Sequence, residues 1–280
     1  MKEKYRVVII VPAGYSHSQC FTEVAFLIRN SLKDLEIDCD LTINELAADR
    51  INVLLGFHLI RNTEVLKDFK YIPYQLEQLS SVEGVFSDSI KTVLSKATAV
   101  WDYSQENVVF LEKQGIKAKH VPVGFHKSLQ QIALKPERDI DVLFFGSMGQ
   151  RRESIMNQLA SETSLRVKTL FGAYGKERDD TIGRAKIIIN IHFYNAKIFE
   201  AVRVSYLLNN ACCVVSEDSA VYPYPAVKLP LVPYDSLVET CRNILANGDD
   251  FGITGKACFE QFKEHYSMVK FLTGAVAGTY

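Results

Sequence analysis

Residues suited to binding a phosphorylated ligand gather in a glycine-containing loop near the middle of the chain. The sequence FFGSMGQRRES places Gly146, Ser147 and Gly149 between an apolar strand and a helix. Helix N-terminal amides attract phosphate, and Arg151 or Arg152 would add a charge-assisted clamp. Cations are mildly unfavourable at a helix N-terminus, so an anionic partner would explain their position. The loop therefore predicts a phosphate site, with a solvated arginine pair as the alternative.

A second stretch, residues 185–217, reads as a strand, a loop, a helix and another strand. Ala185–Ile191 is almost continuously apolar and β-branched, which is typical of a parallel strand buried on both faces. Polar residues follow in the loop and the helix: His192, Lys197, Glu200 and Arg203. Because ligands of open α/β sheets bind beyond the carboxyl ends of strands, this is where a site is expected.

Each of these polar residues also has a simpler interpretation. Glu200 at the helix start is well placed to accept hydrogen bonds from a sugar or ribose diol, and Lys197 to meet a phosphate. Glu200 and Arg203 are also three residues apart, which is the spacing of an ordinary surface ion pair. His192 at a strand end is as consistent with a buried, hydrogen-bonded core histidine as with a ligand-binding residue.

Alternating strands and helices must position these residues. A strand at Tyr5–Val11 is followed by a helical pattern. The alternation continues, with a short helix near Glu45–Asp49, to a strand ending at Val121. It restarts after Asp139 with a strand at Ile140–Phe145. The prediction is an α/β protein of two Rossmann-like domains facing across a cleft. These comprise residues 1–125, a linker at 126–138, and residues 139–280. The final helices, at Phe251–Tyr266 and Met268–Val276, either stay with this last domain or pack back on the first.

Composition narrows the function classes. Of 280 residues, 48% are hydrophobic and 23% charged, which is ordinary globular composition. A net charge of −1 predicts no bulk attraction to nucleic acid, while peripheral contact with a membrane stays open. The N-terminal apolar run of about seven residues fits a strand better than a signal peptide. The six cysteines contain no C-x-x-C pair, so we expect small buried thiols in a cytoplasmic protein.

Several enzyme classes lack their sequence motifs. No G-x-G-x-x-G follows the first strand, so a dinucleotide dehydrogenase is disfavoured. A P-loop and a G-x-S-x-G element are also absent, which weakens the NTPase and hydrolase alternatives. We expect no bound metal or organic cofactor, because the sequence has neither a D-x-D motif nor a cluster of metal-ligand residues.

The two stretches together, FFGSMGQRR and NIHFYNAKIFEAVRVSYLLNNACCVVSE, resemble the nucleotide-sugar-binding domain of group 1 GT-B-type glycosyltransferases. The resemblance rests on Phe199-Glu200-Ala201 and on the strand Cys213–Glu217. It implies that Glu200 contacts the donor's ribose. It also implies that the diphosphate is bound by basic residues: Arg151 or Arg152, and Lys197. The fold is known for working without a metal.

The acceptor would face the first domain, where His17, His58 and Glu77 follow predicted strands. A histidine or a carboxylate suits the base that an inverting transferase needs, and His17 and Glu77 are the candidates for the catalytic residues. The sequence thus predicts transfer of a sugar from a nucleoside-diphosphate sugar to a hydroxyl of a glycan, lipid-linked sugar, protein or nucleobase. A non-catalytic module that binds a glycan or partner, and a sugar-nucleotide epimerase, are the alternatives.

Overall fold

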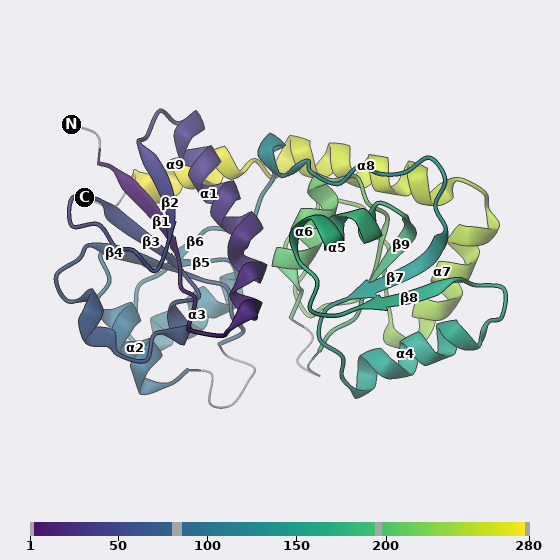
Figure 1. Ribbon diagram of the computed structural model, residues 1–280, viewed down its shortest axis with the longest axis horizontal. Helices are drawn as coiled ribbons and strands as arrows, with labels where there is room; N and C mark the ends of the chain where they lie inside the picture. Colours follow the sequence, from purple (N-terminus) through teal and green to yellow (C-terminus); the bar gives the residue numbers. More distant parts are fainter. Residues whose placement is uncertain (1–2, 80–85, 194–197, 278–280) are drawn as a thin grey trace. The chain divides into compact units, whose positions relative to one another are not determined.

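The computed structural model describes residues 3–79, 86–193 and 198–277 (Figure 1). The chain forms two compact units, each with one parallel sheet and helices on both of its faces. The first unit extends to Ser128 and includes the residues from Ser267 onward, and the second is Leu129–Tyr266. The α/β class predicted from the sequence is confirmed.

The sheet of the first unit has the strand order β2-β1-β3-β4-β5-β6, with all neighbours parallel. The strands are β1 (Tyr5–Ile9), β2 (Cys39–Ile43), β3 (Ile51–Leu55), β4 (Tyr71–Gln75), β5 (Trp101–Asp102) and β6 (Lys119–His120). The chain leaves β1 first toward β2 and then returns to β3 on the other side. The gap between β1 and β3 is therefore a topological switch point, where doubly wound sheets bind ligands.

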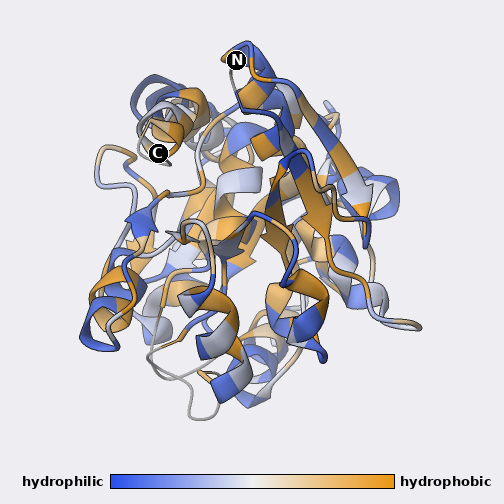
Figure 2. Ribbon diagram, turned by 90° about the vertical axis from the view of Figure 1, so that its left-hand side faces the viewer, coloured by the Kyte–Doolittle hydropathy of each residue, from blue (hydrophilic) through white to orange (hydrophobic). Residues whose placement is uncertain are grey.

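Helices cover this sheet on both faces. The α-helices of the first unit are α1 (Thr22–Asp34), α2 (Asp88–Ser95), α3 (Gln105–Lys113) and α9 (Met268–Val276). Its 3₁₀ helices are η1 (Ser16–Phe21), η2 (Phe57–Leu59), η3 (Thr63–Leu66) and η4 (Lys127–Leu129), which continues one residue into the second unit. Helices α2 and α3 share an apolar core with β1, β3 and β4, whereas α1 packs on β1 and β2. Figure 2 shows the resulting pattern, with apolar strands inside and polar helix faces outside.

The last helix belongs to the first unit, although it is encoded at the far end of the chain. It packs against α1, and the backbone N–H of Met268 donates to the carbonyl of Phe125 at 2.9 Å. The ammonium of Lys119 donates to the carbonyl of Ala275 at 2.8 Å. Residues 126–138 divide between the units, and three of them, His126, Leu129 and Ile132, are buried.

The sheet of the second unit has the order β11-β10-β9-β7-β8, again parallel throughout. The strands are β7 (Ile140–Phe145), β8 (Val167–Leu170), β9 (Ala185–Asn190), β10 (Val214–Glu217) and β11 (Leu231–Val232). The helices are α4 (Gln150–Ser161), α5 (Gly175–Ile182), α6 (Ala201–Asn209), η5 (Tyr234–Ser236), α7 (Leu237–Ala246) and α8 (Asp250–His265). Helices α4 and α7 close one apolar face, while α5, α6 and α8 lie on the other.

Two sequence expectations are corrected by the structure. A short helix expected at residues 45–49 is a turn, because the buried Asn52 side chain occupies both backbone groups of Ala47. Its Oδ1 accepts from the Ala47 N–H at 2.9 Å, and its Nδ2 donates to the Ala47 carbonyl at 2.9 Å. Of the six thiols expected to be buried, Cys20 is exposed. Within the described chain, no helix is long and apolar enough to cross a bilayer.

Candidate functional site

The carboxyl ends of β7, β9 and β10 lie side by side in the second unit and bring three chain segments together. Strand β7 leads into the Gly146 loop, β9 into His192, and β10 into Asp218. The chain leaves β7 toward β8 and later returns to β9, so the switch point of this sheet lies between β7 and β9. The two stretches singled out from the sequence therefore converge at the position where such sheets bind ligands.

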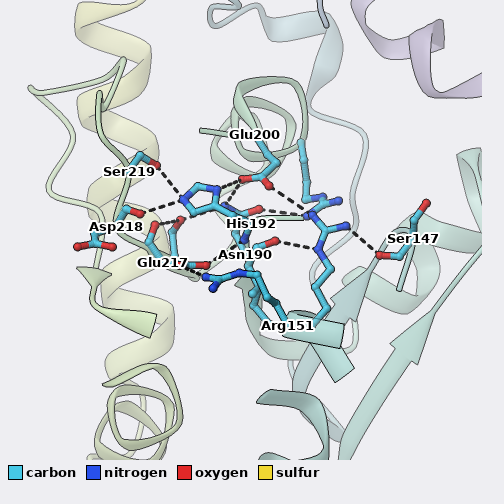
Figure 3. Close-up of polar contacts among 12 residues, drawn as sticks. Ser147, Arg151, Asn190, His192, Glu200, Glu217, Asp218 and Ser219 are labelled. Carbon is cyan, nitrogen blue, oxygen red and sulfur yellow. Dashed lines mark hydrogen bonds and ion pairs between the residues drawn. The ribbon is translucent and has the colours of Figure 1, made fainter. Parts of the chain in front are cut away.

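Glu200 stands at the centre of the cluster, immediately before α6 (Figure 3). Its Oε2 accepts hydrogen bonds from Asn190 Nδ2 at 3.1 Å and from His192 Nδ1 at 2.9 Å. Its Oε1 accepts from Arg152 Nη2 at 3.3 Å. Three donors, two from the end of β9 and one from α4, thus fix the orientation of one partly buried carboxylate.

His192 is almost fully buried, and acceptor groups face both of its ring nitrogens. Nδ1 donates to Glu200, and Nε2 lies 2.9 Å from the Asp218 carbonyl and 3.1 Å from Ser219 Oγ. A carboxylate and a carbonyl can only accept, so this geometry favours the doubly protonated ring. Burial alone would lower the pKa of His192, but the hydrogen bond and charge of Glu200, helped by the Asp218 carbonyl, raise it.

Glu200 responds in the opposite direction. Burial favours its protonated form, but the hydrogen bond and charge of His192 and the charge of Arg203 outweigh burial and lower the pKa of Glu200. Each residue therefore stabilises the charged form of the other.

Arg152 connects the Gly146 loop to this pair. Its Nε donates to the Ile191 carbonyl at 2.9 Å and its Nη1 to the Ser147 carbonyl at 2.8 Å. The guanidinium lies 5.1 Å from the centroids of the Phe144 and Phe193 rings. Burial, with the nearby charge of Arg203, lowers the pKa of Arg152 to about 10, so the group stays charged at neutral pH. All three guanidinium nitrogens of Arg152 donate to protein groups, so Arg152 holds the Ser147 carbonyl, the Ile191 carbonyl and Glu200 together.

Arg203 explains why position 146 is a glycine. Its Nη1 donates to Asn190 Oδ1 at 3.1 Å, and its guanidinium lies 5.4 Å from the ring centroids of Phe144 and Phe145. Gly146 has φ of +128°, and a Cβ there would lie 2.6 Å from Arg203 Nη2. The glycine thus admits a guanidinium against the backbone.

Glu217 was not among the residues assigned a role from the sequence, although it ends the second apolar strand. It is fully buried, accepts a hydrogen bond from the His192 backbone N–H at 3.1 Å, and pairs with Arg151 Nη2. Arg151 lies over the Tyr234 ring, 4.4 Å from its centroid, and its buried Nε lacks a partner in the described chain. An acidic residue closing an otherwise apolar strand was the available sequence signal.

The cluster has an excess of positive charge. Three guanidinium groups and one imidazolium face two carboxylates: Arg151, Arg152, Arg203 and His192 against Glu200 and Glu217. Such a site attracts an anionic ligand, and Arg151 and Arg203 are the cations whose guanidinium groups are least engaged by protein acceptors. Lys197, predicted to meet a phosphate, lies outside the described residues.

The two predicted catalytic residues, His17 and Glu77, belong to the first unit. His17 is exposed in η1, with its ring 5.4 Å from that of Tyr15 in an edge contact. Glu77 follows β4, and its Oε1 lies 3.8 Å from Nε2 of His58. The structure therefore places Glu77 beside His58, which was predicted to lie on the acceptor side but not to be catalytic.

Two parallel-sheet units of this build, with a charged cluster at the strand ends of the second, define the GT-B fold of glycosyltransferases. Solved structures share it over most of the chain. AviGT4, a glycosyltransferase involved in avilamycin A biosynthesis, aligns with a TM-score of 0.62 and 12% identity, covering 99% of this chain and 97% of its own. TarM of S. aureus, crystallised with UDP and alpha-GlcNAc-glycerol, aligns with a TM-score of 0.60 and 11% identity, covering 82% and 55%.

A sequence relative comes from a giant virus. Uncharacterized protein L140 of Acanthamoeba polyphaga mimivirus is 31% identical over 190 residues, which span 65% of this chain. The match covers 61% of the length of L140. No protein-family model matches the chain.

Proposed function

We propose that the protein is a glycosyltransferase that moves a sugar from a nucleoside-diphosphate sugar to a hydroxyl acceptor. The observation that carries the proposal is the fixed carboxylate of Glu200 at the strand ends of the second unit. Three protein donors orient it, and it lies within a cluster that has excess positive charge. A fixed acceptor next to cations suits a ligand that combines a diol with a diphosphate.

Each part of the cluster has a role in this proposal. Glu200 accepts hydrogen bonds from the ribose of the donor. Arg151, Arg203 and the backbone amides at the start of α4 face the diphosphate, as does Lys197 by prediction. These groups place positive potential where negative charge develops on the leaving group. Because guanidinium groups supply that potential, we propose transfer without a metal, and an excess of EDTA should leave the rate unchanged.

The ligands found in structural neighbours support a donor of this class. TarM was crystallised with UDP, and the pneumococcal O-GlcNAc transferase GtfA, with a TM-score of 0.52 and 10% identity, with UDP and GlcNAc.

The test is calorimetry of the folded protein against UDP-, GDP-, CDP- and ADP-linked sugars. We expect one nucleotide class to bind. Glu200→Ala should weaken that binding by about 1–3 kcal/mol, as for loss of charged hydrogen bonds. Glu260→Ala removes a carboxylate on α8 that is 57% exposed, and it should leave the affinity unchanged. Absence of binding to every donor would refute the proposed function.

One observation favours a module that binds without transferring. Arg152 and Glu217 use much of their hydrogen-bonding capacity on other protein groups, as they would in a site kept only for its structure. Donor binding with no release of nucleoside diphosphate would support that alternative. Conversion of the free nucleotide sugar to an isomer, in the absence of acceptor, would support an epimerase.

A further inference from the structure

We propose that a cavity on the second unit binds a phosphate monoester that is attached to an apolar or ring-shaped group. The cavity has a volume of about 350 Å³ and lies between the segment that precedes β7 and the start of α8. Strand β7 is six residues long and carries the Gly146 loop at its other end, about 20 Å away. The cavity is therefore separate from the proposed donor site and does not depend on sugar transfer.

Three cationic side chains line the cavity: Lys135, Arg138 and Lys256. Within the described residues, none of the three forms an ion pair with a carboxylate. Cations gathered at one place repel one another and attract an opposite charge from solution. The lining therefore has the electrostatic character of an anion site.

Neighbouring cations at the same edge of the sheet do have carboxylate partners. Arg166 and Lys186 bind Asp141 at 3.0 and 2.7 Å. Arg184 binds Asp139. The fold thus pairs these cations internally, whereas an anionic ligand would provide the counter-charge for those that line the cavity.

The charge of the lining matches a phosphate monoester. Asp249 is the acidic residue among those that line the cavity. Its carboxylate lies against the first turn of α8, because a Cβ on Gly252 would be only 2.6 Å from Asp249 Oδ1. Three cations against this one carboxylate leave an excess of two positive charges. A phosphate monoester carries a charge of about −1.5 to −2 near neutral pH.

Arg138 is held in place by the protein before any ligand binds. Its Nη1 donates to the Ala185 carbonyl at 3.2 Å, and its Nε donates to the Lys135 carbonyl at 3.3 Å. The guanidinium lies 5.0 Å from the centroid of the Phe251 ring. These contacts leave Nη2 without a protein acceptor in the described chain. A fixed guanidinium with one end available suits a phosphate oxygen.

The segment that carries two of the cations is also anchored. The backbone N–H of Lys135 donates to the Gly183 carbonyl at 2.8 Å. A Cβ on Gly183 would lie 2.4 Å from the Ala133 carbonyl oxygen, so this glycine lets the segment pack closely on the end of α5. One wall of the cavity is therefore preformed, which reduces the entropy lost on binding.

Apolar side chains stand beside the cations and indicate the rest of the ligand. Ile253 is 66% exposed on the first turn of α8, and Pro136 and Phe251 also line the cavity. Inorganic phosphate would leave this apolar surface in water. A phosphate ester with an apolar or ring-shaped organic part would cover it, and such mixed linings are typical of small-ligand sites.

The first experiment uses phenyl phosphate as the probe and the backbone amides of the whole chain, followed by NMR, as the readout. We expect saturable shifts at Gly252 and Ile253. Inorganic phosphate should shift the same amides with about fivefold weaker affinity, because it buries no ring, and phenol should not shift them. Shifts confined to Gly146 and Ser147 would show binding at the donor cluster alone and would overturn the proposal, as would equal shifts with phenol.

The second experiment repeats the titration with variants. Arg138→Gln should weaken phenyl phosphate about 10-fold or more, as for loss of a charged hydrogen bond. Lys256 is exposed, so Lys256→Gln should keep the native amide spectrum and still weaken binding. Ile253→Ser should remove the preference for phenyl phosphate over inorganic phosphate.

A matched control tests whether the attraction is local. Lys263→Gln removes the same charge from the same helix, at a side chain that is 52% exposed and lies outside the lining. We expect it to leave the affinity for phenyl phosphate unchanged. A loss equal to that of Lys256→Gln would indicate diffuse attraction to the surface and would overturn the site.

A third experiment distinguishes a free organic phosphate from a lipid phosphate, since both carry the same monoester. Flotation with phosphatidylcholine vesicles is compared with and without phosphatidic acid. Capture that requires phosphatidic acid and is lost in Arg138→Gln would assign the site to a lipid headgroup. Binding of phenyl phosphate without vesicle capture would assign it to a free organic phosphate. Binding of neither would overturn the proposal, while the donor site would stand or fall on the calorimetric panel alone.

Discussion

Both units place a histidine and a glutamate at the carboxyl edge of a parallel sheet, but the two pairs differ in exposure, in separation and in the direction of the histidine pKa shift. In the second unit, His192 is 1% exposed and donates to Glu200 at 2.9 Å. In the first unit, His58 is 23% exposed and lies 3.8 Å from Glu77, whose side chain is 43% exposed. Only the first of these separations is a hydrogen bond.

The comparison shows how the same two residue types can have histidine pKa values shifted in opposite directions. Burial lowers the pKa of both imidazoles. At His192 the direct hydrogen bond that the ring donates to the fixed Glu200 carboxylate outweighs burial, whereas at His58 the longer, more solvated contact with Glu77 does not. The second unit therefore holds a fixed imidazolium suited to an anion, and the first holds a neutral ring suited to taking a proton.

The largest expected effect on stability comes from disrupting the buried cluster around His192 and Glu200 in the second unit. Arg152→Met removes a buried guanidinium, which takes one of the three donors from Glu200 and leaves the Ile191 and Ser147 carbonyls without this donor. Loss of one partner of a buried pair costs about 3–5 kcal/mol. Urea unfolding should show a lower midpoint, and hydrogen exchange should locate the loss in the second unit.

A double variant checks the cause of that loss. Glu200→Gln in the Arg152→Met background removes the carboxylate that has lost one of its cationic partners and should recover part of the stability. Equal stability of the single and double variants would contradict an electrostatic origin and leave only packing against Phe144 and Phe193.

A second pair of variants compares the two glutamates as ligand contacts. Glu200→Gln should weaken donor binding by about 1–3 kcal/mol, because a neutral amide replaces a charged acceptor. Glu77→Gln should leave donor affinity unchanged, since its carboxylate belongs to the first unit's pair. Calorimetry with the same nucleotide sugar checks both. Equal losses of donor affinity in the two variants would contradict the assignment of donor binding to the second unit.

Much of the fold could be predicted because its signals are local. The apolar β-branched run in β9 and the helical periodicity of α1 can be read directly from the local sequence. Strand β7 and helix α9 were predicted with their observed bounds. The turn at residues 45–49 was predicted as a helix because its outcome depends on Asn52, whose side chain takes the backbone groups of Ala47. Such a contact leaves no periodic trace in the sequence.

The location of the site could be predicted from the sequence, but the arrangement of its side chains could not. Sequence position indicated that Gly146, His192 and Glu200 follow strands, and the parallel order brings those strand ends together. It could not indicate that Arg152 turns inward to bind the Ser147 carbonyl, or that Gly146 makes room for Arg203. Both depend on side-chain directions that only packing decides.

The pH dependence of the second unit's stability tests whether the pKa of His192 is raised or lowered on folding. The pKa of His192 is raised on folding, so its contribution to stability is complete below about pH 6.5 and is lost as pH rises through the folded value. The pKa of His58 is lowered, so its contribution runs the other way, with stability gained as pH rises toward 6.5. Hydrogen exchange of β9 amides between pH 6 and 9 should show protection falling, and His192→Gln should flatten that trend. A rise in protection with pH would contradict the imidazolium assignment.

The smallest expected effect is the stability change from Glu77→Gln. Its partner lies 3.8 Å away and both side chains are partly exposed, so the pair should contribute less than about 1 kcal/mol to the free energy of unfolding. The backbone hydrogen bonds to Gln75 and Asn107 do not depend on the side chain and should persist. Urea unfolding of the first unit, read out by the fluorescence of Trp101 on β5, would detect a larger change. A loss comparable to that of Arg152→Met would mean that Glu77 is a structural residue, whereas a near-neutral change would leave its carboxylate available for a ligand.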